Sequence, residues 1–385
     1  MEVPEAEPPL HYSPVASPAP APAVRSLLAQ PDVHIARLEG ILEHNTISLD
    51  GGDVGCIARV TGHAQAGDAT TPIDIAAAVD CSSSIRSAMP LIRRTMEFVV
   101  SELRSCDRLS IVCYHDEVIE RLSLRSMDDA GKVAARAAIE CMEAGGCTNL
   151  SGGIISAVKQ LQLSHQDQAD ARSRAAAVFV LTDGLPTRGI TNTAQLLHAV
   201  SAAHGSLGRS SCPISAFGFG ESHDSAMLSS LAEHTEGTYC FIDDVDGIAP
   251  AFAECLGGMQ SLVAQNVKLL IEPDGDASVT DVLSSYPDET STPKVINFGD
   301  LRADEQKDVV IEVHLPVWLV TPGAPQPCLS LSLSFWDIAE ARSRVLKQTV
   351  RINRENNIDS SPCIDVEIQR QRILVSRALL AAQQG

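Results

Sequence analysis

The hydrophobic pattern between residues 72 and 260 alternates between two periods. Continuous apolar runs of strand length, among them 73–79, 108–114 and 175–181, are separated by stretches in which apolar residues recur every three or four positions. The first of these stretches, residues 85–103, has the spacing of an amphipathic helix that packs on a sheet. Repeated strand–helix pairs predict right-handed crossovers and a doubly wound, mostly parallel, Rossmann-like α/β sheet with both faces buried.

The pattern changes after residue 261. Apolar segments there alternate or run continuously between Pro and Gly residues, with no long helical stretch between them, at 267–271, 279–283, 309–315, 328–335 and 345–352. This pattern is typical of an antiparallel β-sandwich. Two earlier segments, at 33–38 and 55–61, have no place in a parallel sheet, and we expect them to join the sandwich.

These patterns divide the chain into five segments. We predict a disordered Pro/Ala-rich leader over 1–31, strands of the β-sandwich over 32–66, an α/β domain over 70–260, a β-sandwich companion domain over 262–355 and a C-terminal helix over 362–384. The two outer parts of the sandwich would then flank an inserted α/β domain.

Charge and cysteine usage narrow the class of protein. Lys and Arg number 29 against 49 Asp and Glu, a formal net charge of −20, which disfavours nucleic acid and anionic membranes as partners. The 11 cysteines include no Cys-x-x-Cys pair, a usage typical of a reducing compartment. Residues 1–7 lack the pattern of a signal peptide, and no apolar run reaches the roughly 18 residues of a membrane span. We expect a cytoplasmic protein with no membrane insertion, and the oligomeric state is not indicated.

The apolar strand at 71–80 ends in an acid that is followed, at two-residue intervals, by two hydroxyls: Asp80, Ser82 and Ser84. Where a strand stops at the carboxyl edge of a sheet, such side chains can converge on one point. A set of oxygen atoms suits Mg²⁺ or Mn²⁺, although three do not complete an octahedron. The ordinary alternative is that Ser82 or Ser84 caps the helix that follows.

Two later segments can supply the missing ligands. Thr148 lies in the glycine-rich loop 145–153, and the apolar strand 175–182 also ends in an acid, Asp183. Carboxyl ends of parallel strands meet at one edge of the sheet, where open α/β sheets bind ligands. Capping alone does not account for Thr148 and Asp183. We therefore predict a metal site formed by Asp80, Ser82, Ser84, Thr148 and Asp183.

The motif Asp80-x-Ser82-x-Ser84, followed by Thr148 and then Thr182-Asp183-Gly184, resembles the metal-ion-dependent adhesion site of a von Willebrand factor type A (vWA) domain. The resemblance covers about residues 70–260 and implies the doubly wound fold. The sequence departs from the usual motif in Ser83, where glycine is common, and in Cys147 before the threonine. Neither departure removes a ligand, although Ser83 restricts the backbone more than glycine would.

A second resemblance lies after the α/β domain. Residues 296–316 are similar to a hairpin of the companion region that follows vWA domains in intracellular plant RING-plus-vWA proteins and in inter-alpha-trypsin-inhibitor-like chains. Those plant proteins carry a RING, for which this sequence has no paired zinc-ligand cysteines.

The vWA resemblance implies a divalent metal that binds an exposed Asp or Glu of a protein partner. We therefore predict a metal-dependent protein-binding module with no catalytic residues and no enzymatic activity. One alternative is a non-catalytic substrate-recognition subunit, or a paralogue, of a RING/vWA ubiquitin ligase. A Mg²⁺-dependent phosphoryl-transfer enzyme is disfavoured, because such sites need a second acid where Ser82 stands and a Lys or Arg to hold phosphate.

Overall fold

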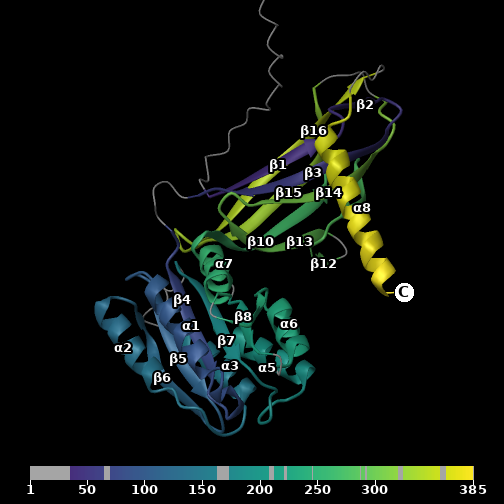
Figure 1. Ribbon diagram of the computed structural model, residues 1–385. Helices are drawn as coiled ribbons and strands as arrows, with labels where there is room; N and C mark the ends of the chain where they lie inside the picture. The colour runs from purple at the N-terminus through teal and green to yellow at the C-terminus, as the bar shows by residue number, and fades with distance from the viewer. Residues whose placement is uncertain are drawn as a thin grey trace, which may run out of the picture. The chain divides into compact units, whose positions relative to one another are not determined.

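A computed structural model shows how the chain folds. It describes residues 35–64, 70–162, 173–207, 212–220, 223–244, 246–286, 288–290, 293–319, 324–355 and 361–384. The predicted leader over 1–31 lies outside these residues. The predicted fold class is confirmed: a mostly parallel sheet with helices, further sheets of mainly antiparallel strands, and a C-terminal helix (Figure 1).

The α/β domain is organised around one six-stranded sheet with the strand order β6-β5-β4-β7-β8-β9. The strands are β4 (Ile73–Asp80), β5 (Arg108–Tyr114), β6 (Val118–Ser126), β7 (Ala175–Thr182), β8 (Ile214–Phe219) and β9 (Tyr239–Ile242). All neighbours are parallel except β5 and β6. The sequence pattern missed β6, because this edge strand is largely exposed and has no apolar run.

Helices cover both faces of this sheet: α1 (Met89–Glu102), α2 (Asp129–Glu140), α3 (Leu150–Gln160), α5 (Thr193–Gly205), α6 (Ser225–His234) and α7 (Ile248–Gln260). Successive side chains of a strand point to opposite faces. In β4, Ile75 and Val79 pack with α1, α2 and α7, whereas Ala76 and Ala78 pack with α3, α5 and α6. Strand β4 is therefore buried on both faces.

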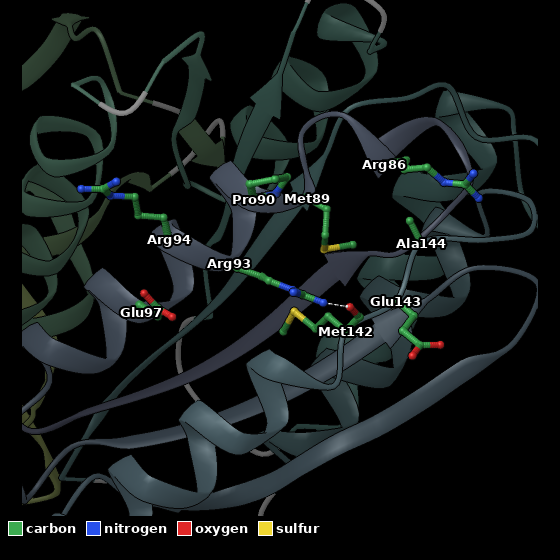
Figure 2. A pocket seen from close by; sticks show the side chains of 9 residues that line it. All are labelled: Arg86, Met89, Pro90, Arg93, Arg94, Glu97, Met142, Glu143 and Ala144. Carbon is green, nitrogen blue, oxygen red and sulfur yellow. Dashed lines mark hydrogen bonds between the residues drawn. The ribbon is translucent and has the colours of Figure 1, made fainter.

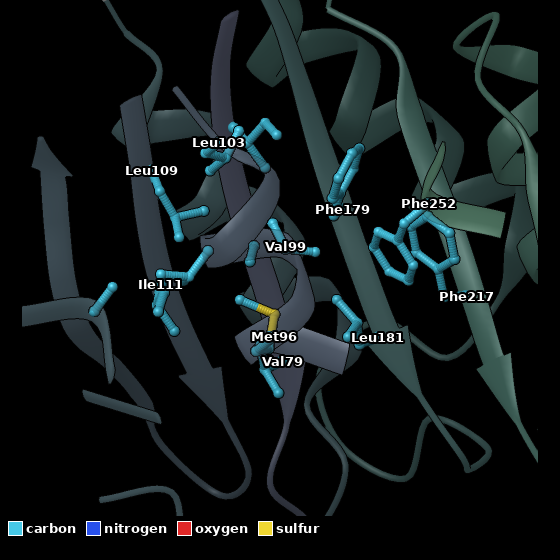
Figure 3. Packing of buried hydrophobic residues seen from close by; sticks show 14 of the residues in the cluster. Val79, Met96, Val99, Leu103, Leu109, Ile111, Phe179, Leu181, Phe217 and Phe252 are labelled. Carbon is cyan, nitrogen blue, oxygen red and sulfur yellow. The ribbon is translucent and has the colours of Figure 1, made fainter. Parts of the chain in front are cut away.

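Figure 3 shows the core beneath α1, where Met96 of the helix lies next to Val79 of β4 and Val99 belongs to the same cluster. Phe217 of β8 stacks on Phe252 of α7 with ring centroids 4.0 Å apart. The apolar periodicity of the sequence thus corresponds to the packed face of α1. This packing holds the carboxyl end of β4 in place, where the candidate site begins.

The sheet order reverses between β4 and β7. From β4 the chain continues outward through β5 and β6, and after β7 it continues in the other direction through β8 and β9. A crevice for ligands forms outside the carboxyl ends of the strands at such a switch point. Asp80 ends β4 and Thr182 ends β7, so the fold brings both predicted acidic segments to this point.

The remaining strands form a four-stranded sheet, β1-β3-β14-β11, and a six-stranded sheet, β12-β13-β10-β15-β16-β2. Their bounds are β1 (Ala36–Leu42), β2 (Thr46–Ser48), β3 (Gly52–Gly62), β10 (Leu262–Pro273), β11 (Ser278–Leu283), β12 (Asp288–Thr290), β13 (Lys294–Arg302), β14 (Gln306–Leu315), β15 (Gln326–Asp337) and β16 (Arg342–Glu355). Strands before the α/β domain pair with strands after it, as β3 does with β14. The domain limits themselves stay a prediction.

The motif at 296–316 does not form the hairpin that we expected. Strand β13 pairs with β10 and β12, whereas β14 pairs with β3 and β11, so the two consecutive strands belong to different sheets. The chain turns between them at Asp304, whose φ of 60° is left-handed. The apolar run Val309–Ile311 belongs to an inner strand, which has a neighbour on each side.

The C-terminal helix α8 (Ile364–Gln384) packs on the four-stranded sheet. Val366 and Ile373 contact a cluster that includes Ile57 and Val310. Arg370 pairs with Glu43 (2.6 Å) and with Glu312 of β14 (2.8 Å). In the part of the chain that the structure describes, no helix is long and apolar enough to cross a membrane.

Candidate metal centre

The candidate site begins where β4 ends. Asp80 is fully buried, and its two carboxylate oxygens have different partners. Oδ1 accepts a hydrogen bond from the Ser82 amide (2.8 Å), and Oδ2 accepts one from the Thr182 hydroxyl (2.6 Å). These two bonds link the ends of β4 and β7. They hold the carboxylate against the loop that carries the two serines.

The two serine hydroxyls lie together and reach the second acid. Ser82 Oγ and Ser84 Oγ are 3.0 Å apart, and Ser84 Oγ donates to Asp183 Oδ1 at 3.0 Å. Ser82 is buried, whereas Ser84 is exposed. The cluster therefore has a closed inner side at Asp80 and an outer side that is open to solvent at Ser84.

Thr148 joins the cluster from the loop before α3. Its backbone carbonyl accepts hydrogen bonds from the amides of Thr187 (3.0 Å) and Arg188 (3.1 Å), which lie after β7. Its hydroxyl borders Gly184: a Cβ at this glycine would lie 3.1 Å from Ser84 Oγ and 3.7 Å from Thr148 Oγ1. A side chain at position 184 would therefore crowd the cluster. Glycine leaves the space among the oxygens free.

The structure thus brings all five predicted residues to one place. The donors are two carboxylates and three hydroxyls, which is the chemistry that Mg²⁺ and Mn²⁺ prefer. No group of three or more His, Cys, Asp or Glu side chains able to hold a metal occurs among the described residues. The donor chemistry and the space at Gly184 fit a small divalent cation.

The electrostatics of the two acids also fit a cation. Burial raises the pKa of Asp80 to about 6, against the opposing effect of its hydrogen bonds from Thr182 and Ser82. Burial also raises the pKa of Asp183, with a smaller opposing effect from Ser84. A nearby positive charge favours the ionised form of a carboxyl group. A cation between these acids would therefore relieve the cost of burying them.

The side chains of Ser82 and Ser84 do not cap the helix that follows them. The residue that caps α1 is Ala88, with no side-chain hydrogen bond, and the short 3₁₀ turn at Ser84–Arg86 also lacks a side-chain cap. The Ser82 and Ser84 hydroxyls bond instead to each other and to Asp183. Ser83 has φ −64° and ψ −31°, a conformation that every residue adopts, so the loop needs no glycine there.

Three neighbours of the site were not predicted as parts of it. Thr182 donates to Asp80, and its place directly before Asp183 at a strand end was the available signal. Arg188 lies 3.3 Å from Asp116, whose Oδ1 also accepts from the Cys147 amide (3.2 Å). These bonds tie the loop of Thr148 to the loop after β5. No local sequence pattern indicates that pairing.

Comparison with known families agrees with this fold. The family model of the von Willebrand factor type A domain matches residues 73–241. This segment is therefore a vWA domain, which is a class of protein-interaction module.

Two relatives are similar in sequence to part of this chain. It is 27% identical over 253 residues to the E3 ubiquitin-protein ligase WAV3 of Arabidopsis thaliana, covering 64% of this chain and 31% of the relative. It is 28% identical over 199 residues to the uncharacterized protein YfbK of Escherichia coli (strain K12), covering 50% and 32%. The chain thus spans about a third of the length of these relatives.

Among solved structures, the chain resembles a von Willebrand factor type A protein from Catenulispora acidiphila. The TM-score is 0.59 at 17% sequence identity, with 86% of this chain and 76% of that chain covered. At this identity the likeness concerns the fold alone. It extends beyond residues 73–241, because the vWA match accounts for a smaller part of the chain.

Proposed function

We propose that the chain is a non-enzymatic binding protein that uses a divalent cation, Mg²⁺ or Mn²⁺, to bind an exposed Asp or Glu of a protein partner. The observation that carries the proposal is the convergence of five oxygen-bearing side chains at the switch point of the sheet. Asp80, Ser82, Ser84, Thr148 and Asp183 would hold the cation. When bound, it would supply a Lewis-acidic position for one oxygen of the partner's carboxylate.

The residues have distinct roles in this proposal. The buried Asp80 supplies negative charge at the closed side, and Thr182 and the Ser82 amide orient it. Ser84 and Thr148 border the open space at Gly184. Leu185, which follows Gly184, is exposed and offers an apolar contact beside the open position. Two acids against a charge of +2 leave the centre close to neutral, so an incoming carboxylate is not repelled locally.

The test is binding of a fluorescein-labelled Gly/Ser peptide that carries a single central Asp, compared with the same peptide carrying Asn. In excess Mg²⁺ the anisotropy should rise only with the single-Asp peptide. Chelator and Asp80→Asn should each abolish that rise, whereas Glu140→Gln, which removes an exposed acid at the end of α2, should not. Equal binding of the two peptides, or binding that persists in chelator, would overturn the proposal.

A second candidate function is favoured by the likeness to a protein named as an E3 ubiquitin ligase. In it, this chain recognises substrates for a ligase in the cell interior and does not itself transfer ubiquitin. In the test, the full chain is isolated from cells together with any ligase bound to it. The isolate is then assayed for ubiquitin transfer with purified activating and conjugating enzymes. Transfer should occur with the wild type and with Asp80→Asn, because only substrate contact uses the metal. Absence of transfer with both proteins would contradict this candidate.

A further inference from the structure

An arginine-rich cleft lies beside the candidate metal centre. Its volume is about 700 Å³, and it is formed by the start of α1 and the loop after α2. Three arginines, Arg86, Arg93 and Arg94, and two glutamates line it, together with Met89 and Met142. In Figure 2, the side chain of Arg93 extends to the Met142 carbonyl, whereas Arg86 and Arg94 lie on opposite sides of Arg93 and point away from it. A local excess of positive charge is unusual on a chain whose net charge is −20.

The cleft and the metal centre share one loop. Ala144 lines the cleft, and the two glycines that follow it bond to the metal-binding loop: the Gly145 amide donates to the Cys81 carbonyl (2.8 Å), and the Ser83 amide donates to the Gly146 carbonyl (3.0 Å). Thr148 comes two residues later. On the other wall, Arg86 is two residues from Ser84. The cleft and the candidate metal centre are therefore linked through the loop 144–148 and through residues 84–86.

The arginines of the cleft have unused hydrogen-bonding capacity. None of the three forms an ion pair within the described ranges of the chain. Arg93 donates from one terminal nitrogen to the Met142 carbonyl, and its buried Nε has no acceptor. Arg86 and Arg94 are exposed, so their guanidinium groups are accessible to a ligand. A planar guanidinium binds a carboxylate through two parallel hydrogen bonds.

We propose that this cleft is a second acidic-residue subsite, which binds a glutamate of the same partner segment whose first acid occupies the metal centre. The inference rests on the proposed function, because it requires that first contact. Three arginines and two glutamates leave the cleft with one net positive charge, which matches a single carboxylate better than a doubly charged phosphate. Met89, which retains a small exposed surface, supplies an apolar contact for the methylene groups of glutamate.

The test uses two fluorescein-labelled probes, the single-Asp peptide and an octaglutamate of similar length. Octaglutamate presents carboxylates at every spacing, so one can reach the cleft while another is at the metal. In excess Mg²⁺ the wild type should bind octaglutamate at least about tenfold more tightly than the single-Asp peptide, the scale of one charge-assisted pair. Arg86→Gln with Arg93→Gln should remove this advantage and leave single-Asp binding unchanged.

Two further variants separate ligand contact from structure. Arg94→Gln removes a cleft charge without touching the bond between Arg93 and Met142 and should lower octaglutamate affinity severalfold. Arg136→Gln removes an exposed arginine of α2 that does not line the cleft and should change neither affinity. If octaglutamate has no advantage in the wild type, or keeps it in all the cleft variants, the subsite is refuted. Metal-independent binding of the single-Asp peptide would refute the proposed function instead, and the arginine variants would still decide whether the cleft binds acid.

Discussion

Asp80 carries the largest electrostatic cost at the candidate site, because burial raises its pKa to about 6. In chelator, Asp80→Asn should therefore not destabilise the protein. One pKa unit corresponds to about 1.4 kcal/mol, so removing the charge should raise the free energy of unfolding by on the order of 1–3 kcal/mol. Urea unfolding of the two proteins in chelator measures this. Glu140→Gln is the control, and a large loss in Asp80→Asn would show that its charge is needed for folding.

The same pKa predicts how metal stabilisation depends on pH. Without metal, the pKa of Asp80 in the folded state is about 6, above its ordinary value of 3.8. Between pH 3.8 and about pH 6 the folded state therefore binds more protons than the unfolded state. The free energy of unfolding then falls as pH rises toward about 6. The metal binds the ionised form of the Asp80 carboxylate. The difference in thermal midpoint between Mg²⁺ and chelator should thus be small at pH 5 and complete above about pH 7. A difference that is constant with pH would contradict this role for Asp80.

At this scale, two strand ends and one glycine-rich loop indicated the five candidate ligands. Asp80 and Asp183 each follow an apolar run, and parallel strands bring such ends together. For the bond from Thr182 to Asp80 the available signal was the place of Thr182 at a strand end. The pair of Arg188 with Asp116, which joins residues 72 positions apart, has no local sequence signal. We also saw no sequence signal for the cleft, since its arginines repeat at helical spacing like those of any solvated face.

Among the secondary-structure elements, α8 is held in part by one cationic side chain. Arg370 is mostly buried between Glu43 and Glu312. Arg370→Gln should lower the free energy of unfolding by about 2 kcal/mol, because it leaves Glu43, Glu312 and the more exposed Glu367 without their charged donor. Arg372→Gln, an exposed position on the same helix, should change it by less than about 0.5 kcal/mol. Urea unfolding measures both, and equal effects would show that the pairing does not stabilise α8.

The inner strands were the most predictable elements. Runs such as Ile73–Asp80 and Ala175–Thr182 are buried at every position, so an apolar run marks them. Strand β6 is exposed along most of its length and leaves no such mark. The pairing of β13 and β14 with different sheets is set by long-range neighbours, which short-range pattern cannot identify.

For the whole molecule, the net charge of −20 opposes the approach of an acidic partner. Salt screens such long-range repulsion, with a Debye length of about 10 Å at 0.1 M. The association rate constant of octaglutamate, measured by stopped-flow anisotropy in Mg²⁺, should therefore increase with ionic strength. The cleft arginines act at close range and should mainly affect dissociation. An association rate that falls with salt would indicate that the local positive charge controls the approach.

The central claim is that one centre in the vWA domain binds a divalent cation. The most direct measurement is the thermal midpoint of the full chain in excess Mg²⁺ and in chelator, for the wild type and Asp80→Asn. Binding to the folded state alone should stabilise the wild type by about 2.7 kcal/mol at a hundredfold excess over Kd, and the variant should show no shift. The same shift in both proteins, or none in the wild type, would contradict the assignment of the metal centre to Asp80, Ser82, Ser84, Thr148 and Asp183.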